Sequence, residues 1–327
     1  MEKDRILITG GSGFIGTNLV EYLLRRDLTI MNMDCRRPLN REHDGCWVQG
    51  DILDADSLER IFSEYHPTHV IHMAARTDLD EKKSLDGYRA NIQGTENVLR
   101  CVSKTSSVQR AMITSSMLVC RLGHVPATDY DYSPSNLYGE SKVLTEQITR
   151  SFGLSCTWLI TRPTTIWGPW SLRYRDELFA VLAKGRYFHP GNKPVIKTYG
   201  YAGNVAHQIY RLLELPADIV HRKTFYLGDH PMELRAWVDK FSEGLRGKKV
   251  KTGPVWLFHG AASVGDLLAS IGVTFPLTTF RLMNMMTSQV LDVGKTIEIT
   301  GQPPYTMVEG VCRTIEWLRK NREARSQ

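Results

Sequence analysis

The 327-residue sequence predicts an α/β fold, with a doubly wound parallel sheet and a smaller, mostly α C-terminal lobe. Three observations carry this prediction. Short apolar runs alternate with amphipathic stretches through the first half of the chain, a glycine-rich turn follows the first apolar run, and the alternation weakens after about residue 165. Because parallel strands need crossover connections, such alternation favours a parallel sheet covered by helices on both faces.

Six apolar runs have the length and composition of strands, and five amphipathic stretches have helical periodicity. The predicted strands are residues 6–9, 28–34, 46–51, 69–75, 110–116 and 156–163. The predicted helices lie near residues 14–26, 55–65, 84–104, 135–152 and 175–184.

The predicted division of the chain lies after residue 165. Residues 1–165 form the sheet domain, and residues 166–327 form a second lobe in which Gly, Pro and aromatic residues are frequent. Some segments of this lobe, such as 195–227, are expected to return to the sheet. A lobe laid over the carboxyl ends of the strands would cover the crevice where open α/β sheets bind ligands.

Composition sets limits on partners and location. The net charge of +6 comes from 41 basic and 35 acidic residues without a basic block, so no nucleic-acid partner is expected. The six cysteines form no CxxC pair, which predicts reduced thiols, no metal and a cytoplasmic protein. His259 and Asp266 interrupt the most apolar stretch, 254–277, so no transmembrane segment is expected.

The glycine-rich turn TGGSGFIG follows the first predicted strand and opens the first predicted helix. Gly10, Gly13 and Gly16 fit the spacing GxxGxxG, and Gly11 in place of Gly10 gives GxGxxG. Such a turn lets the backbone approach a pyrophosphate, while amides at the helix N-terminus point at it. Strand, turn and helix in this order predict a Rossmann-type dinucleotide site.

The residues after the second and third strands bear on which dinucleotide binds. Asp34 ends the second strand, where a carboxylate accepts hydrogen bonds from the adenosine ribose and repels a 2′-phosphate, so we predict NAD. Arg36 and Arg37 follow directly and could cradle that phosphate, which leaves NADP open. Asp51 and Ile52 follow the third strand, where they can hold the adenine amino group and its face.

Seven motifs share the order and spacing of a known family. They are TGGSGFIG, GDILD (50–54), HMAA (72–75), NIQGT (91–95), TSS (114–116), YGESK (138–142) and RPTTIWGP (162–169). Over essentially its whole length the chain resembles the extended short-chain dehydrogenase/reductases, especially the nucleotide-sugar epimerase/dehydratase branch. The resemblance implies an NAD(P)-dependent enzyme of nucleotide sugars, often a homodimer paired through two long helices, here those near 84–104 and 135–152.

The resemblance also implies cofactor contacts. It places Phe14 and Ile15 at the pyrophosphate loop, and Ala74, Ala75 and Arg76 beside the adenosine half of the cofactor. It places Asn91 near the cofactor and the active-site backbone, and Pro163 at the nicotinamide.

Tyr138 and Lys142 lie four residues apart on one predicted helix, so their side chains share a face. A phenol is a poor base at neutral pH because its pKa is about 10. The Lys142 ammonium and the positive nicotinamide ring together would lower that pKa, and Lys142 would also bond the nicotinamide ribose. Ser116, after the fifth strand, would hold the substrate hydroxyl. We therefore predict proton removal by Tyr138 with hydride transfer to nicotinamide.

Departures from the family narrow the reaction. Met117 and Leu118 stand where sugar 4,6-dehydratases usually carry acidic residues, and neither can transfer a proton, so elimination is disfavoured. Decarboxylation is disfavoured too, since related decarboxylases tend to carry Glu in place of Leu118. Cys120 replaces the usual Tyr of the family's VYG motif, either as a second acid or base or as a small, partly buried side chain. Epimerisation through a ketone, with 4-epimerisation preferred, or net redox at a carbinol remains.

Three residues are candidate substrate contacts. Thr165 stands where sugar epimerases frequently have Asn. Lys197 falls where the family often has an Arg that reaches the diphosphate, and Arg281 has roughly the spacing of a second phosphate-binding Arg. Two cations would suit a diphosphate through charge-assisted hydrogen bonds.

Two alternatives to the epimerase stay open. The segment YGYAGNVAHQI also resembles the steroid dehydrogenase/isomerase branch, which leaves open a dehydrogenase or ketoreductase of a nucleotide sugar or a steroid-like alcohol. The second alternative is a non-catalytic NAD(P)-sensing protein on the same fold. Such proteins typically lose the catalytic Tyr or Lys, and this chain keeps both.

Overall fold

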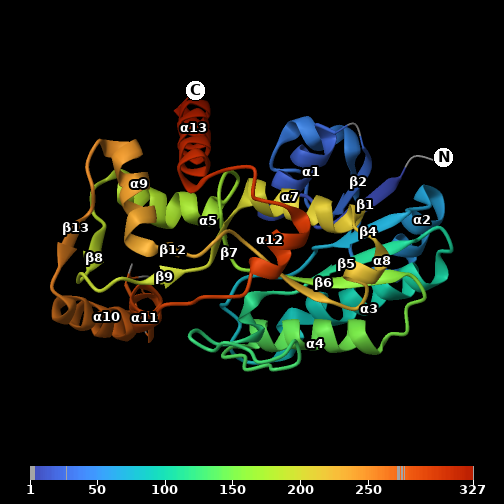
Figure 1. The fold of residues 1–327 in the computed structure, drawn as a ribbon, viewed down its shortest axis with the longest axis horizontal. Coiled ribbons are helices and arrows are strands. Elements are labelled where there is room, and N and C mark those ends of the chain that lie inside the picture. The colour runs from blue at the N-terminus through green and yellow to red at the C-terminus, as the bar shows by residue number, and fades with distance from the viewer. Residues whose placement is uncertain (1–3, 27, 271–272, 274, 276, 327) are drawn as a thin grey trace.

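A seven-stranded parallel sheet forms the centre of the computed structural model, which describes residues 4–26, 28–270, 273, 275 and 277–326 (Figure 1). The strand order is β11-β6-β5-β4-β1-β2-β3, and every neighbouring pair is parallel. The strands are β1 Arg5–Thr9, β2 Thr29–Asp34, β3 Trp47–Gln49, β4 His69–His72, β5 Arg110–Thr114, β6 Thr157–Pro163 and β11 Thr224–Leu227. The predicted doubly wound sheet is confirmed, and the segment 195–227 supplies its seventh strand.

The helices of the first half also match the predicted stretches. They are α1 Phe14–Leu24, α2 Ala55–Tyr65, α3 Arg89–Lys104 and α4 Leu137–Ser151. Ahead of α3, Ser84 caps a separate 3₁₀ turn, Leu85–Tyr88. The helix predicted near 175–184 is also present: α5 Leu172–Tyr174, a π turn Arg175–Phe179 and α6 Ala180–Ala183 follow one another without a break.

Alternation along each strand builds two apolar layers. Ile6 and Ile8 of β1 belong to one buried cluster, with side chains of α1 and of α7 Ala202–Glu214. Leu7, between them, belongs to the cluster on the opposite face, with side chains of α2 and α3. Because successive side chains of a strand point to opposite faces, the sheet is covered on both sides and its carboxyl edge stays available for a site.

The second lobe has its own buried centre, built around Trp167, Trp237 and Phe241, whose rings lie 5.2–5.7 Å apart. Three two-stranded sheets hold it together: β7 Thr165–Trp167 with β10 Tyr199–Tyr201, β9 Ile196–Lys197 with β12 Met232–Glu233, and β8 Phe188–Pro190 with β13 Lys251–Gly253. Its helices are α8 Ala217–Val220, beside the sheet, and α9 Leu234–Arg246, α10 Val255–Ser270, α11 Thr279–Met286, α12 Gly294–Thr300 and α13 Met307–Ser326. Among the described residues, none of the helices has the length and apolar character needed to cross a membrane.

Candidate functional site

The glycine turn lies at the carboxyl end of β1, pressed against the chain after β4. Gly10 has φ +78°, and a Cβ there would lie 2.5 Å from the Ala74 nitrogen. A Cβ on Gly16 would lie 2.4 Å from the Gly10 oxygen, so a side chain there would push α1 off the turn. Around Gly13 the only close atom is that same oxygen, at 3.3 Å. Gly10 and Gly16 thus permit the tight turn, and Gly13 leaves room for a ligand at the start of α1.

Asp34 is buried at the end of β2, and backbone amides fix its carboxylate. Oδ2 accepts a hydrogen bond from the Ser12 amide at 3.1 Å, and Oδ1 accepts one from the Arg36 amide at 3.0 Å. The Arg36 and Arg37 side chains are exposed, and the Arg37 guanidinium lies 5.7 Å from the centre of the Trp47 ring. The carboxylate is therefore held beside the glycine turn, where a ribose hydroxyl could donate to its remaining lone pairs.

Ile52 is buried beneath the turn that follows β3. A Cβ on Gly94 of α3 would lie 2.4 Å from Cδ1 of Ile52, and the side-chain amide of Asn97 donates to the Ile52 carbonyl at 3.0 Å. Asp51 is exposed and accepts the Leu53 amide at 2.9 Å. Helix α3 therefore fixes the position of Ile52, while the Asp51 carboxylate shapes the turn.

Asn91 on α3 joins two parts of the site. Its side chain accepts the Arg76 amide at 2.8 Å and donates to the Arg76 carbonyl at 3.0 Å and to Ser141 Oγ at 2.9 Å. The Arg76 guanidinium is itself bonded to Asp78 at 2.8 Å. Asn91 thus locks the backbone of the predicted 74–76 segment onto α4, and the Arg76 charge is already compensated.

The structure brings Ser116, Tyr138 and Lys142 together at the carboxyl end of β5. Ser116 caps a short 3₁₀ turn, Met117–Val119, and hydrogen-bonds the Tyr138 hydroxyl. Lys142, one turn after Tyr138 on α4, donates its ammonium to the Thr114 carbonyl at 2.9 Å. All three side chains are more than nine-tenths buried. The ring of Tyr88 lies 6.0 Å from that of Tyr138 and closes one side of the group.

In the protein alone, the pKa of Tyr138 lies above its ordinary value. Burial raises the pKa of this phenol to about 12, and the Ser116 hydrogen bond offsets only part of the rise. The Lys142 ammonium bonds a carbonyl, and burial lowers its own pKa to about 8. In the protein alone desolvation therefore outweighs the expected help from Lys142, so a phenolate needs a positive charge brought next to it.

Replacing Lys142 by Met is expected to raise the free energy of unfolding by about 2 kcal/mol at neutral pH. The variant no longer has to bury a charged ammonium, which stabilises the folded chain, but it loses the hydrogen bond to Thr114, which offsets part of that gain. Below pH 8 the folded and unfolded chains both carry the ammonium, because the folded pKa is about 8 against 10.5 for the ordinary group. Between these values the folded chain loses its proton first, so the gain shrinks as pH rises. Denaturant unfolding over a pH series measures this.

The exposed Lys104, replaced by Met, is the control for this series and should show no such pH-dependent gain. A Lys142→Met protein less stable than wild type at neutral pH would contradict the expectation.

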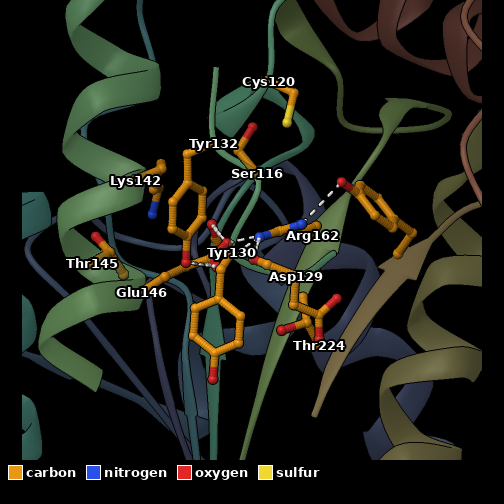
Figure 2. Close-up of polar contacts among 12 residues, drawn as sticks. Ser116, Cys120, Asp129, Tyr130, Tyr132, Lys142, Thr145, Glu146, Arg162 and Thr224 are labelled. Atoms are coloured by element: carbon orange, nitrogen blue, oxygen red, sulfur yellow. Dashed lines mark hydrogen bonds and ion pairs between the residues drawn. The ribbon is translucent and has the colours of Figure 1, made fainter. Parts of the chain in front are cut away.

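A buried polar network beside Ser116, Tyr138 and Lys142 is the largest feature that sequence reasoning missed (Figure 2). Arg162 makes two bonds of 2.8 Å to Glu146, and both side chains are fully buried. Ser115 and Tyr132 donate to the same carboxylate at 2.6 and 2.9 Å, and Arg162 donates to Tyr226 at 3.1 Å. One signal was present in the sequence, since Glu146 lies four residues after Lys142, on the same helix face.

Met117 and Cys120 are held by apolar and backbone partners. The Met117 sulfur accepts a hydrogen bond from Thr165 at 3.7 Å, and its side chain packs on a small buried cluster around Tyr226 and Leu291. Cys120 is buried and donates to the Asp131 carbonyl at 3.3 Å, and burial raises the pKa of its thiol. Of the two alternatives for Cys120, these contacts favour the small buried side chain over an acid or base.

The three candidate substrate residues occupy different places. Thr165 reaches the Met117–Val119 turn through its contact with Met117. Lys197 is buried on β9, pairs with Gln289, and has its pKa lowered by burial to about 8. Arg281 lies on α11, ion-paired with Glu177 at 3.0 Å. Pro163 is buried at the end of β6.

Comparison with known proteins agrees with this geometry. The profile of the NAD dependent epimerase/dehydratase family matches residues 6–228. An N-acetyl-alpha-D-glucosaminyl-diphospho-ditrans,octacis-undecaprenol 4-epimerase of Escherichia coli O157:H7 is 26% identical over 326 residues, covering 96% of this chain and 95% of that protein. A 3 beta-hydroxysteroid dehydrogenase/Delta 5-->4-isomerase of Mycobacterium tuberculosis is 30% identical over 222 residues, 63% of this chain and 59% of that protein.

Among solved structures, the UDP-glucose 4-epimerase of Thermus thermophilus in complex with NAD is similar with a TM-score of 0.69 at 22% identity, over 96% of this chain and 99% of that one. This likeness shows the fold. The profile match extends over more than half of the chain, from the second residue of β1 to the residue after β11. The resemblance inferred from the motifs is thereby confirmed, and the chain belongs to the NAD dependent epimerase/dehydratase family.

Proposed function

We propose that the protein is an NAD-dependent sugar epimerase, acting at C4 of a sugar linked to a diphosphate, with a nucleotide sugar as the first candidate. The observation that carries this proposal is the buried group of Ser116, Tyr138 and Lys142 next to the apolar Met117. The group suits proton transfer at a carbinol, and neither Met117 nor Leu118 supplies the carboxylates that elimination would use.

The residues around the glycine turn fit the dinucleotide. The first turn of α1, without a side-chain cap, would hold the pyrophosphate, and the fixed Asp34 carboxylate would accept the adenosine ribose hydroxyls. Ile52 and the backbone of 74–76 would line the adenosine half. When bound, NAD would supply the hydride acceptor.

The protein's own residues would transfer the proton and position the cofactor and the substrate. Tyr138 would take the proton of the substrate hydroxyl with the help of Ser116. It would return the proton to the oxygen after the keto sugar has rotated in the site and its other face has been reduced. Lys142, anchored on Thr114, would hold the nicotinamide ribose beside Tyr138. The buried cation Lys197 would approach the diphosphate, and the Arg281 guanidinium would have to leave Glu177 to join it.

A net dehydrogenase or ketoreductase is the second candidate. The 30% identity to a hydroxysteroid dehydrogenase and the apolar surroundings of Met117 favour it. A sensing protein without turnover is disfavoured because Tyr138 and Lys142 are both present and in contact with the catalytic turn.

Retained cofactor separates these candidates. Purified protein is denatured and the released dinucleotide is measured by absorbance, and a panel of nucleotide sugars is then screened for interconversion. Retained NAD with interconversion and no net NADH supports the epimerase. Stoichiometric use of added NADPH would support the reductase instead, and no turnover of any carbinol would support a sensor.

Replacing Asp34 by Ala is expected to shift the preference for NAD over NADP by about 10- to 100-fold, since charged hydrogen bonds to the ribose contribute about 1.5–3 kcal/mol. The 2′-phosphate of NADP would then meet the Arg36 and Arg37 side chains without repulsion from the Asp34 carboxylate. Dissociation constants for the two dinucleotides measure the shift. Asp56→Ala, in the first turn of α2, is the control. An unchanged preference would remove Asp34 from the site.

We propose a division at residue 165/166, which the separate buried cluster of the second lobe supports, with β11 returned to the first domain. We also propose a homodimer formed through α3 and α4, which pack side by side on one face of the sheet, and a cytoplasmic location. Sedimentation velocity tests the dimer.

A further inference from the structure

One edge of the second lobe exposes an unusual number of large apolar side chains. Trp256 and Leu257 begin α10 with exposed fractions of 70% and 49%, and Phe280 and Met283 on α11 are exposed at 52% and 55%. Phe188 on β8 adds a further 47%. These five residues define the apolar edge. Because α10 packs against α11 and β8 pairs with β13, these side chains belong to neighbouring elements, and contiguous exposed apolar groups mark surfaces that meet a partner or a membrane.

The two segments that build this edge are also basic. Residues 184–193 and the described residues 244–270 and 277–290 contain eight Lys or Arg residues and one acidic residue, Asp266. The pairing of β8 with β13 places Phe188 directly opposite Lys251, so the two segments meet at the edge. Lys248 and Lys249 are exposed just before β13. Asp266 accepts the Thr279 amide at 3.1 Å and ties α10 to α11.

The position of the edge leaves it free to meet a large surface. In Figure 1, α10, α11 and β13 lie at the end of the long axis away from the central sheet. Helix α10 has 16 residues, about 24 Å of helix. Trp256 is its second residue, and Lys248, Lys249 and Lys251 precede it, so an aromatic side chain and several cations meet at one end of the helix, as they do at membrane–water interfaces.

From the exposed apolar residues and the surrounding charge we propose that this edge docks on the surface of an anionic lipid bilayer. Trp256, Leu257 and Phe280 would enter the boundary between headgroups and acyl chains, and the lysines would contact headgroup phosphates. A second copy of the chain fits less well, because a twofold interface would oppose two like-charged edges. A nucleic acid would meet the charges but leave the apolar side chains in water.

Vesicle sedimentation with the full chain tests this inference. The wild-type protein should sediment with vesicles of phosphatidylcholine mixed with phosphatidylglycerol, and less with phosphatidylcholine alone or at high salt. The double variants Trp256→Ser/Leu257→Ser and Lys248→Glu/Lys249→Glu should each bind at least about tenfold more weakly. A blue shift of tryptophan fluorescence on binding should be lost in Trp256→Phe.

Matched exposed sites elsewhere are the controls. Val125→Ser/Tyr130→Ser removes an aliphatic and an aromatic group exposed at 68% and 66%, and Lys82→Glu/Lys83→Glu reverses two exposed charges; neither should alter vesicle binding. The proposal is overturned if wild-type protein stays in the supernatant with anionic vesicles at low salt, or if both edge variants sediment like wild type. It is also overturned if the edge variants abolish self-association, or binding to duplex DNA, rather than vesicle binding. Because no readout uses turnover, failure of the epimerase proposal leaves this test unaffected.

Discussion

Turnover by the Tyr138→Phe variant is expected to fall by about 10²- to 10⁴-fold, the usual contribution of a positioned acid–base group. The ring keeps its place against Tyr88, so only the hydroxyl that contacts Ser116 is lost. Because that hydroxyl lies in the proposed proton path and outside the glycine turn, the affinity for NAD should change little. Steady-state rates on the active sugar and NAD titration measure the two effects separately.

Tyr88→Phe is the matched control for this change. It removes a buried hydroxyl from the neighbouring ring, and this hydroxyl donates to the Asp78 carbonyl instead of to the catalytic group. Its turnover should stay within a few-fold of wild type, with a stability cost of about 1 kcal/mol. If Tyr138→Phe retained substantial activity, the base would have to be another group.

Replacing Arg162 by Met should lower the free energy of unfolding by about 3–5 kcal/mol, because the buried Glu146 carboxylate loses its bidentate partner and keeps only the longer 3.5 Å ion pair with Arg150. Both side chains are fully buried, and the pair is bonded through two 2.8 Å contacts. Adding Glu146→Gln to the same chain removes the buried carboxylate charge and should recover much of the lost free energy of unfolding. Denaturant unfolding of the two single variants and the double variant gives the coupling energy.

The exposed pair of Lys104 and Glu59 offers a comparison for this pair. Its atoms approach to 2.6 Å, but the side chains are 60% and 47% exposed, so Lys104→Met should cost under about 1 kcal/mol. Losses of equal size at the two pairs would mean that the buried network contributes no more than a surface contact does.

Local patterns predicted the first half of the fold well. Helix α2 spans the predicted residues 55–65, since a strong apolar periodicity and the cap at Asp54 both lie within one short stretch. The glycine turn and the Tyr138/Lys142 spacing are local in the same sense. Each signal needs only neighbouring residues, so it can be recognised from the sequence before any tertiary contact is known.

What the sequence could not predict depends on contacts between distant residues. Arg162 bonds Glu146 only because β6 packs against α4 in the folded chain. No pattern within either segment predicts a buried ion pair. The direction of the Tyr138 pKa shift depends on how completely the ring is buried, and the spacing to Lys142 carries no such information.

The ammonium of Lys142, held out of water against the Thr114 carbonyl, has a consequence for engineering. A library screened only for heat tolerance would enrich substitutions at this position, because losing the charge favours the folded chain. The most robust survivors would then be inactive proteins. Selection for activity must accompany selection for heat tolerance, and stabilising substitutions are better sought on the surface than around Lys142.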